Sequence, residues 1–270
     1  MAVGDGLQRR MRRVLPHRGA LILPVDGGLI DGPLGALKDP FGFFQENLLS
    51  NVDAILGFRG LLSACSGLLD GTPFIVNLSA STALSSHTHK RLVGTVEAAV
   101  RSGADAVGFQ LHLSDPKEGD MLADLGRVVD EADSFGMPVM VIAYPRKGTA
   151  EGDNNYHQLR ATNLDRYALL VSHAVRVAVE MGANIVKTHY TGTRESFREV
   201  VKAACGVPIV VAGGPHCSDA EAEAKAVCAI SAGAWGIAYG RQIFMHSDPA
   251  AITERLRRAV NTAVANEGGS

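Results

Sequence analysis

The chain alternates short apolar runs with longer segments in which apolar residues recur at helical spacing. Eight of the short runs predict buried strands at residues 20–25, 53–58, 73–78, 104–111, 138–144, 185–187, 207–212 and 234–239. The longer segments predict helices at residues 40–49, 90–101, 117–135, 163–181, 194–204, 218–232 and 249–265. This alternation favours a parallel sheet in which a helix follows each strand.

The absence of a linker or a shift in composition predicts one (β/α)8 TIM barrel domain over residues 1–270. A length of 270 residues is ordinary for this fold. A doubly wound open sheet is the alternative. No GxGxxG motif follows the first strand, which weakens a dinucleotide-binding interpretation.

The N-terminal segment, residues 7–15, places apolar residues on one side of a helix that also carries several arginines. A basic amphipathic helix can contact a membrane, a partner or the rest of its own domain. Because this segment is short and lacks an aromatic anchor, we expect it to close the bottom of the barrel. No long apolar run follows the arginines, so no secretory signal is predicted.

Composition and charge narrow the class of function. Hydrophobic residues make up 46% of the chain and the net charge is −2, which predicts a large core and no nucleic-acid footprint. No apolar run is long enough to cross a bilayer, so no membrane partner is expected. The four cysteines form no CxxC pair, which favours free thiols in a reducing, cytoplasmic setting.

Lys187 is the first candidate for chemistry. Of the seven lysines, it is the only one that ends a predicted buried strand, while the others are expected in loops or on polar helix faces. The C-terminal ends of barrel strands carry the active site in this fold, and desolvation there favours the neutral amine. A neutral amine can attack a ketone to form a Schiff base. The alternative is a lysine that extends from the strand end to solvent.

Asp26 and Tyr144 end the predicted first and fifth strands, so their side chains could face the same mouth as Lys187. A carboxylate and a phenol beside a Schiff-base lysine could supply the proton transfers that the reaction needs. Singly, Asp26 could be only a turn residue and Tyr144 only a rim aromatic. Together with Lys187 they favour a catalytic site.

Glycines follow the last two predicted strands, where barrel enzymes often bind phosphate. Gly213 and Gly214 follow the seventh strand, and Gly240 and Arg241 follow the eighth. Glycine allows backbone amides to approach an anion closely, and an arginine adds a charge-assisted contact. Tight turns without a ligand are the alternative. The coincidence of both pairs favours a phosphate site.

Histidines raise the question of a metal. His87, His89, His112, His157 and His189 lie near predicted strand ends or in the long polar loop 145–160. No carboxylate or cysteine stands at a zinc-signature spacing, so we expect no metal. We expect His189 to line the pocket or to pack against the next helix. The loop itself has the length of a functional lid over residues 147–157.

Five motifs, in order along nearly the whole chain, resemble the DhnA-type class I aldolases, a branch of the DeoC/FbaB barrel superfamily. The motifs are Val25-Asp26-Gly27-Gly28, Ala143-Tyr144-Pro145-Arg146-Lys147-Gly148, Val186-Lys187-Thr188-His189-Tyr190-Thr191-Gly192, Ala212-Gly213-Gly214-Pro215 and Gly240-Arg241-Gln242-Ile243-Phe244. The resemblance implies a Schiff base on Lys187, acid/base roles for Asp26 and Tyr144, and phosphate binding by the two glycine loops. It also implies a reaction without metal or cofactor and a homo-oligomeric ring, often a decamer.

Two departures from the fructose-bisphosphate aldolase branch bear on the substrate. That branch has a tryptophan where this chain has Ile142 and a lysine where it has Ser81, in a loop that leaves Ser79 and Ser81 as possible pocket residues. The Val186-Lys187-Thr188 sequence is more similar to the branch that includes 2-amino-3,7-dideoxy-D-threo-hept-6-ulosonate synthase. That branch joins a ketose-phosphate fragment to L-aspartate semialdehyde on routes to aminohydroxybenzoate or aromatic precursors.

The expected partners are therefore a phosphorylated ketone, such as dihydroxyacetone phosphate, and an aldehyde. A fructose-1,6-bisphosphate aldolase and a lysine-dependent thiolase acting on a phosphorylated dione are alternatives within the same resemblance. A metal-dependent lyase that uses the histidines and a non-catalytic sugar-phosphate binder are alternatives from other classes.

Overall fold

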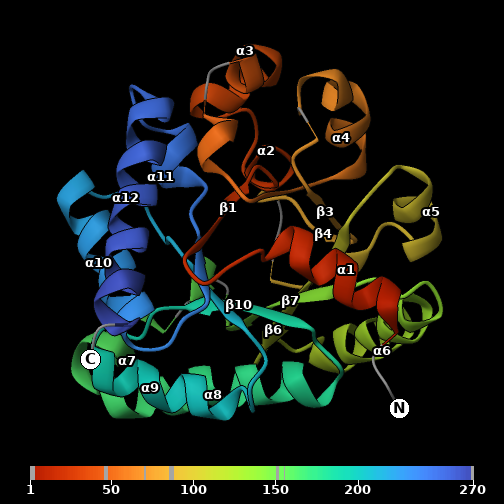
Figure 1. The fold of residues 1–270 in the computed structure, drawn as a ribbon. Helices are drawn as coiled ribbons and strands as arrows, with labels where there is room; N and C mark the ends of the chain where they lie inside the picture. The colour runs from red at the N-terminus through yellow and green to blue at the C-terminus, as the bar shows by residue number, and fades with distance from the viewer. Residues whose placement is uncertain are drawn as a thin grey trace.

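In the computed structural model, which describes residues 4–45, 48–69, 71–84, 88–149, 152–154 and 156–268, parallel strands close into a barrel surrounded by helices (Figure 1). The barrel strands are β1 (Ala20–Pro24), β2 (Ala54–Gly57), β3 (Phe74–Asn77), β6 (Ala106–Leu113), β7 (Val139–Pro145), β10 (Ile185–His189), β11 (Ile209–Ala212) and β12 (Gly236–Ala238). Their order around the barrel is β1-β12-β11-β10-β7-β6-β3-β2, so strands consecutive in the chain are neighbours. The predicted TIM barrel is confirmed.

Longer helices cover the outside of the barrel, and short ones occupy its loops. The α-helices are α1 (Asp5–Val14), α2 (Gly27–Ile30), α3 (Pro40–Gln45), α4 (Arg59–Cys65), α5 (Val96–Arg101), α6 (Glu118–Ser134), α7 (His157–Thr162), α8 (Leu164–Glu180), α9 (Arg194–Ala203), α10 (Asp219–Ser231), α11 (Arg241–Phe244) and α12 (Pro249–Gly268). The 3-10 turns η1 (Gly35–Lys38), η2 (Leu49–Asn51) and η3 (Ser66–Leu68) lie before or after α3 and α4 in the chain.

Side chains that alternate along each strand build two separate cores. Leu21, Leu23 and Ile55 belong to the outer core, between the strands and the helices. Ile22 and Leu56 belong to the inner core, which fills the barrel. Because successive side chains in a strand point to opposite faces, a residue's parity decides whether it can reach the interior.

The inner core is apolar at the bottom of the barrel and polar at the top. On β10 the inward positions run from Ile185 through Lys187 to His189, and on β7 they run from Met140 through Ile142 to Tyr144. The strand pairing places Lys187 opposite Ile142. The barrel therefore carries its reactive side chains where the packed interior ends, at the C-terminal ends of the strands.

Helix α1 closes the opposite end of the barrel, as the sequence predicted. Val14 and Leu15 are buried in the inner core, and Arg10 donates to the main-chain oxygens of Phe135 and Gly136, just after the end of α6. Arg13 pairs with Asp105 before β6 at 2.7 Å. Over the residues placed by the structure, no helix combines the length and apolar character needed to span a bilayer.

Two predicted boundaries were wrong. A helix over residues 90–101 was expected, but residues Arg91–Leu92 form β5, which pairs antiparallel with β4 (Ser79–Ala80), and α5 starts only after Thr95. The Thr95 hydroxyl accepts from the Ala98 N–H, which sets the helix start at this N-cap. The loop over residues 145–160 was expected to have no regular structure, but it contains a hairpin of β8 (Lys147–Thr149) and β9 (Gly152–Asn154) and the start of α7.

Candidate active site

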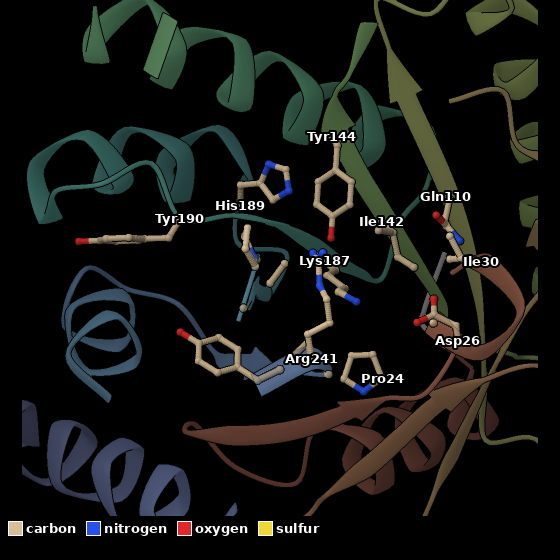
Figure 2. A pocket seen from close by; sticks show the side chains of 18 of the residues that line it. Pro24, Asp26, Ile30, Gln110, Ile142, Tyr144, Lys187, His189, Tyr190 and Arg241 are labelled. Carbon is tan, nitrogen blue, oxygen red and sulfur yellow. The ribbon is translucent and has the colours of Figure 1, made fainter. Parts of the chain in front are cut away.

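A cavity of about 490 Å³ opens at the C-terminal ends of the barrel strands. It brings together eight of the residues that the sequence singled out: Asp26, Tyr144, Lys187, His189, Gly213, Gly214, Gly240 and Arg241. Figure 2 shows the side chains of Lys187, Tyr144 and Arg241 meeting near the centre, with Asp26 on one side and His189 on the other. The segments that meet here lie far apart in the sequence and are joined only by the closure of the barrel.

Lys187 is 6% exposed and has inward parity on β10. Burial lowers the pKa of its ammonium group, since the charged form is poorly solvated in the barrel mouth. The Asp26 carboxylate acts in the opposite direction, and the Arg241 guanidinium lowers the pKa further. A larger share of neutral amine at neutral pH follows, which is the form that attacks a carbonyl carbon.

Tyr144 stands two residues beyond Ile142 on β7 and faces the same space. Its ring stacks on His189 with 4.1 Å between centroids and 12° between planes, and it stacks more loosely on His112. Burial raises the pKa of the phenol, so the hydroxyl stays protonated at neutral pH and is able to donate a proton or a hydrogen bond. The stacking fixes the direction in which this donor points.

Asp26 follows β1 and immediately precedes the short helix α2. The Asn77 side-chain amide, from the end of β3, donates to Asp26 Oδ2 at 3.1 Å. This buried bond orients the carboxylate of Asp26, which lines the cavity. A fixed carboxylate beside a lysine and a phenol is suited to moving protons between them.

His189 has a neutral imidazole in this setting. Burial, followed by the Arg146 and Arg160 guanidinium groups, lowers its pKa to about 3. Its Nδ1 lies 3.3 Å from the Tyr167 hydroxyl, which connects the cavity wall to α8. The geometry therefore gives His189 the place in the pocket wall that the sequence predicted.

The glycines of the expected phosphate loops stand where a side chain would not fit or would be strained. A Cβ on Gly240 would lie 2.6 Å from the Pro24 carbonyl oxygen, and one on Gly213 would lie 3.0 Å from the Tyr239 ring. Gly214 has a φ of +78°, a left-handed conformation that glycine adopts without strain. Arg241 opens α11 beside them, and its side chain extends into the cavity (Figure 2).

Ser79 and Ser81 are not brought to the cavity wall. Ser79 is completely buried; its hydroxyl accepts from the Gln110 N–H at 2.7 Å, and its own N–H donates to Asn77 Oδ1. Ser79 therefore holds the β4–β5 hairpin against β6 instead of lining the pocket. Ser81 follows β4 and is also absent from the cavity lining.

The structure adds Lys90 and Gln110, which sequence reasoning missed. Lys90 was expected on a polar helix face, but it is completely buried and lines the cavity. Gln110 is 4% exposed and has inward parity on β6. The Gly94-Thr95 helix-start signal could have separated Lys90 from α5, and the period of β6 could have found Gln110.

The histidines do not gather into a metal site in the part of the chain that the structure places. There, no three or more histidine, cysteine, aspartate or glutamate side chains come close enough to hold a metal ion. His87, one of the histidines considered from the sequence, lies outside the described residues. His112 is used structurally, because its Nδ1 donates to the Thr88 carbonyl oxygen at 2.6 Å.

Comparison with known proteins agrees with this architecture. The model of the DeoC/LacD family aldolases matches residues 20–246. The chain is 36% identical, over 95% of its length and 92% of the relative, to 2-amino-3,7-dideoxy-D-threo-hept-6-ulosonate synthase of Halobacterium salinarum. It is 34% identical, over 90% of its length and 85% of the relative, to 2-amino-4,5-dihydroxy-6-oxo-7-(phosphonooxy)heptanoate synthase of Streptomyces griseus.

A solved structure shares the fold over almost the whole chain. It is an archaeal fructose-1,6-bisphosphate aldolase whose catalytic lysine is covalently bound to the carbinolamine intermediate. The TM-score is 0.81 and the identity 27%, with 94% of this chain and 99% of that chain covered. The expected enzyme class, a carbon–carbon lyase, is confirmed. The chain belongs to the DeoC/LacD family of aldolases and is a class I, Schiff-base aldolase of the DhnA type.

Proposed function

We propose that this enzyme joins dihydroxyacetone phosphate to L-aspartate semialdehyde through a Schiff base on Lys187. The observation that carries the proposal is the position of Lys187, which is buried, has a lowered pKa and lines the cavity at the barrel mouth. Asp26, Tyr144 and the two glycine loops border the same space. A phosphorylated ketone, a nucleophilic amine and two proton-transfer groups therefore have places within reach of each other.

The names of the relatives support this choice of substrates. The product of the Streptomyces relative is an amino acid with a seven-carbon chain, a ketone at carbon 6, a phosphate on carbon 7 and hydroxyls at carbons 4 and 5. An aldol addition joins the carbon beside a ketone to a former aldehyde carbon, here carbons 5 and 4. Breaking that bond gives dihydroxyacetone phosphate and aspartate semialdehyde.

The Halobacterium relative supports the acceptor in particular. The name of its product also describes a seven-carbon amino acid with a ketone at carbon 6, but without an oxygen substituent on carbon 7. The two products thus share the amino-acid end and differ at the ketone end. The acceptor aldehyde is the part of the reaction that the two names have in common.

The first half of the proposed reaction takes place on the ketone. The Lys187 amine adds to the ketone carbon, and the resulting carbinolamine loses its hydroxyl as water after that oxygen has gained a proton. The product is a protonated imine, which withdraws electrons from the neighbouring carbon. Loss of a proton from that carbon gives an enamine. Asp26 and Tyr144 are the groups that carry these protons.

The second half forms the carbon–carbon bond. The enamine carbon attacks the aldehyde carbon of the acceptor, and the aldehyde oxygen gains a proton as it becomes the new hydroxyl. Tyr144 is suited to donate this proton, since burial keeps its phenol protonated. Water then adds to the imine carbon, and the product leaves with the Lys187 amine restored. The donor phosphate is held throughout by the Gly213, Gly214 and Gly240 loops and by Arg241.

Fructose-1,6-bisphosphate aldolase activity is the second candidate, favoured by the structural similarity to an archaeal enzyme with that activity. It would use glyceraldehyde 3-phosphate as the acceptor. Against it stands Ile142, which lines the cavity where the fructose-bisphosphate branch carries a tryptophan. The absence of a lysine at Ser81 points the same way.

The direct test is a coupling assay that follows the seven-carbon phosphorylated product by mass spectrometry. The enzyme is incubated with dihydroxyacetone phosphate and either aspartate semialdehyde or glyceraldehyde 3-phosphate. We expect product with the first acceptor, none with the Lys187→Met variant, and full activity with Lys202→Met, whose lysine is exposed and pairs with Glu199. Product only from glyceraldehyde 3-phosphate would replace the proposal by the second candidate.

A further inference from the structure

We propose that Lys90 and Gln110 form a subsite that binds the carboxylate of the acceptor aldehyde. This inference rests on the proposed function, because it assigns the part of the cavity that the donor ketone and its phosphate leave unused. Lys90 is completely buried and Gln110 is 4% exposed, and both line the cavity. Neither has a role in forming the Schiff base.

The loop that carries Lys90 is attached to the barrel at several points. Pairing of β4 with β5 fixes the base of the hairpin, in the register Ser79 to Leu92. The His112 ring bonds to the Thr88 carbonyl oxygen, and the Lys90 N–H bonds to Met121 Sδ at 3.5 Å. These contacts hold the Lys90 main chain beside β6, and from this position Lys90 lines the cavity.

Gln110 lies on β6, two residues before His112, and offers an unused donor. Its main-chain N–H bonds to the Ser79 hydroxyl, but its buried side-chain Nε2 has no hydrogen-bond partner among the residues that the structure describes. A buried amide without a partner is costly, because its hydration is lost and nothing replaces it. A ligand oxygen in the cavity would remove this cost.

The topology places this pair across the mouth from the donor phosphate site. In the barrel order β1-β12-β11-β10-β7-β6-β3-β2, β6 lies opposite β12 and β3 lies opposite β11. Lys187 on β10 stands between the two sides. A ketone whose phosphate rests on the loops after β11 and β12 therefore directs its reactive carbon toward Lys90 and Gln110, where the acceptor must lie.

The charges on this side favour a carboxylate over a phosphate. A bound carboxylate would pair with the Lys90 amine in its ammonium form, and Gln110 adds a neutral donor, while Asp26 and Asp31 also line the cavity. The Lys90 loop approaches α2 directly, since the Ala83 N–H donates to the Ile30 carbonyl oxygen next to Asp31. A doubly charged phosphate would be repelled by these carboxylates more strongly than a singly charged carboxylate.

The test compares two acceptors that differ in one group: succinic semialdehyde, which keeps the carboxylate, and butanal, which lacks it. The measured quantity is the ratio of their kcat/KM values with dihydroxyacetone phosphate as donor. We expect Lys90→Met to lower this ratio by about ten- to one-hundredfold, as for loss of a charge-assisted hydrogen bond, mainly through KM. Lys90→Arg should restore part of it, and Lys117→Met, at an exposed lysine, should not change it.

An unchanged ratio in Lys90→Met, or a wild-type enzyme that does not prefer succinic semialdehyde, would overturn the inference. A greater loss with glyceraldehyde 3-phosphate than with succinic semialdehyde would also overturn it, in favour of a phosphate subsite. If Lys90→Met fails to fold, Gln110→Glu replaces it: the added carboxylate should lower the same ratio, and an unchanged ratio would contradict the subsite.

Borohydride trapping separates this inference from the proposed function. With dihydroxyacetone phosphate, both the wild-type enzyme and Lys90→Met should form the reduced adduct on Lys187, because the acceptor subsite takes no part in that step. An adduct without any carboxylate preference contradicts the subsite alone. Absence of the adduct from the wild-type enzyme contradicts the proposed function, and the subsite with it.

Discussion

Tyr144 and His189 stack face to face at the mouth of the barrel, with 4.1 Å between ring centroids. They come from neighbouring strands, β7 and β10, and both have inward parity. The imidazole is neutral and the phenol protonated, for the same reason: burial disfavours the charged form of each. The pair therefore presents a rigid, uncharged proton donor beside Lys187.

Removal of the phenol hydroxyl tests whether Tyr144 is that donor. Tyr144→Phe keeps the ring and its stacking, so we expect a melting temperature near that of the wild type. We expect kcat to fall by about 100- to 10,000-fold, the usual loss for a general acid–base group. Steady-state rates with dihydroxyacetone phosphate and the acceptor measure this loss. A change in kcat of less than about twofold would exclude a proton-transfer role.

The lowered pKa of His189 predicts how the stability of the protein depends on pH below neutrality. Its pKa in the folded protein, about 3, lies below the ordinary value of 6.5, so the unfolded chain binds this proton more readily. Above pH 6.5 the histidine is neutral in both the folded and the unfolded chain and does not change the stability with pH. As the pH falls from 6.5 toward 3, the unfolded chain takes up the proton and the folded protein loses stability. His189→Phe keeps an aromatic ring but cannot bind a proton, so its melting temperature should fall less than that of the wild type between neutral pH and about pH 4.5. An equal fall in melting temperature for the two proteins over this pH range would contradict the neutral imidazole.

Arg241 should matter much more for phosphorylated donors than for other ketones. We expect Arg241→Met to raise KM for dihydroxyacetone phosphate by about ten- to one-hundredfold, through loss of a charge-assisted contact. Hydroxyacetone, which lacks the phosphate, serves as the internal control: its kcat/KM should fall much less, by only the effect of Arg241 on the pKa of Lys187. Equal losses with both ketones would show that Arg241 acts on the reacting atoms or on the fold.

Lys187 should reduce stability at neutral pH. Because its pKa is lowered in the folded protein, the unfolded chain takes up the proton more readily below the ordinary value of 10.5, and stability falls as the pH falls through this range. Lys187→Met removes the penalty. We expect the variant to melt at a higher temperature than the wild type at neutral pH, by a margin that shrinks toward pH 10.5. A lower melting temperature across this range would contradict a buried, destabilising lysine.

The sequence was sufficient to predict residues that sit at strand ends. Lys187 and Tyr144 each close an apolar run, and in a parallel barrel every such run ends at the same mouth. The glycines after β11 and β12 were found in the same way. These predictions needed only the order of the strands, which the alternation of apolar runs and helices gives.

Lys90 could not be found by this reasoning, because its position depends on pairing between distant segments. It precedes a two-residue strand, β5, whose partner β4 lies before the loop that Lys90 ends. Apolar spacing continued across this point into α5, so local periodicity favoured a helix that the hairpin overrides. Ser79 was predicted as a possible pocket residue because it follows a strand. Its hydroxyl instead accepts a hydrogen bond from Gln110 of the next barrel strand, and the residue does not line the cavity.

The oligomeric state could not be predicted from the order of the strands, because it depends on the surface side chains that form contacts between subunits. The homo-oligomeric ring implied by the resemblance stays a prediction. Sedimentation of the purified enzyme at several concentrations checks it, and a single species with the mass of one chain, 28.4 kDa, would contradict it.

The most direct test of the account is to reduce the enzyme with sodium borohydride in the presence of dihydroxyacetone phosphate, then measure the intact mass and map the peptides. The account predicts one added donor molecule per chain, located on Lys187, and none in Lys187→Met. An adduct on another lysine, such as Lys90 or Lys225 of the same cavity, would contradict the assignment of the nucleophile. No adduct at all, from an enzyme that still turns over this ketone, would contradict a Schiff base.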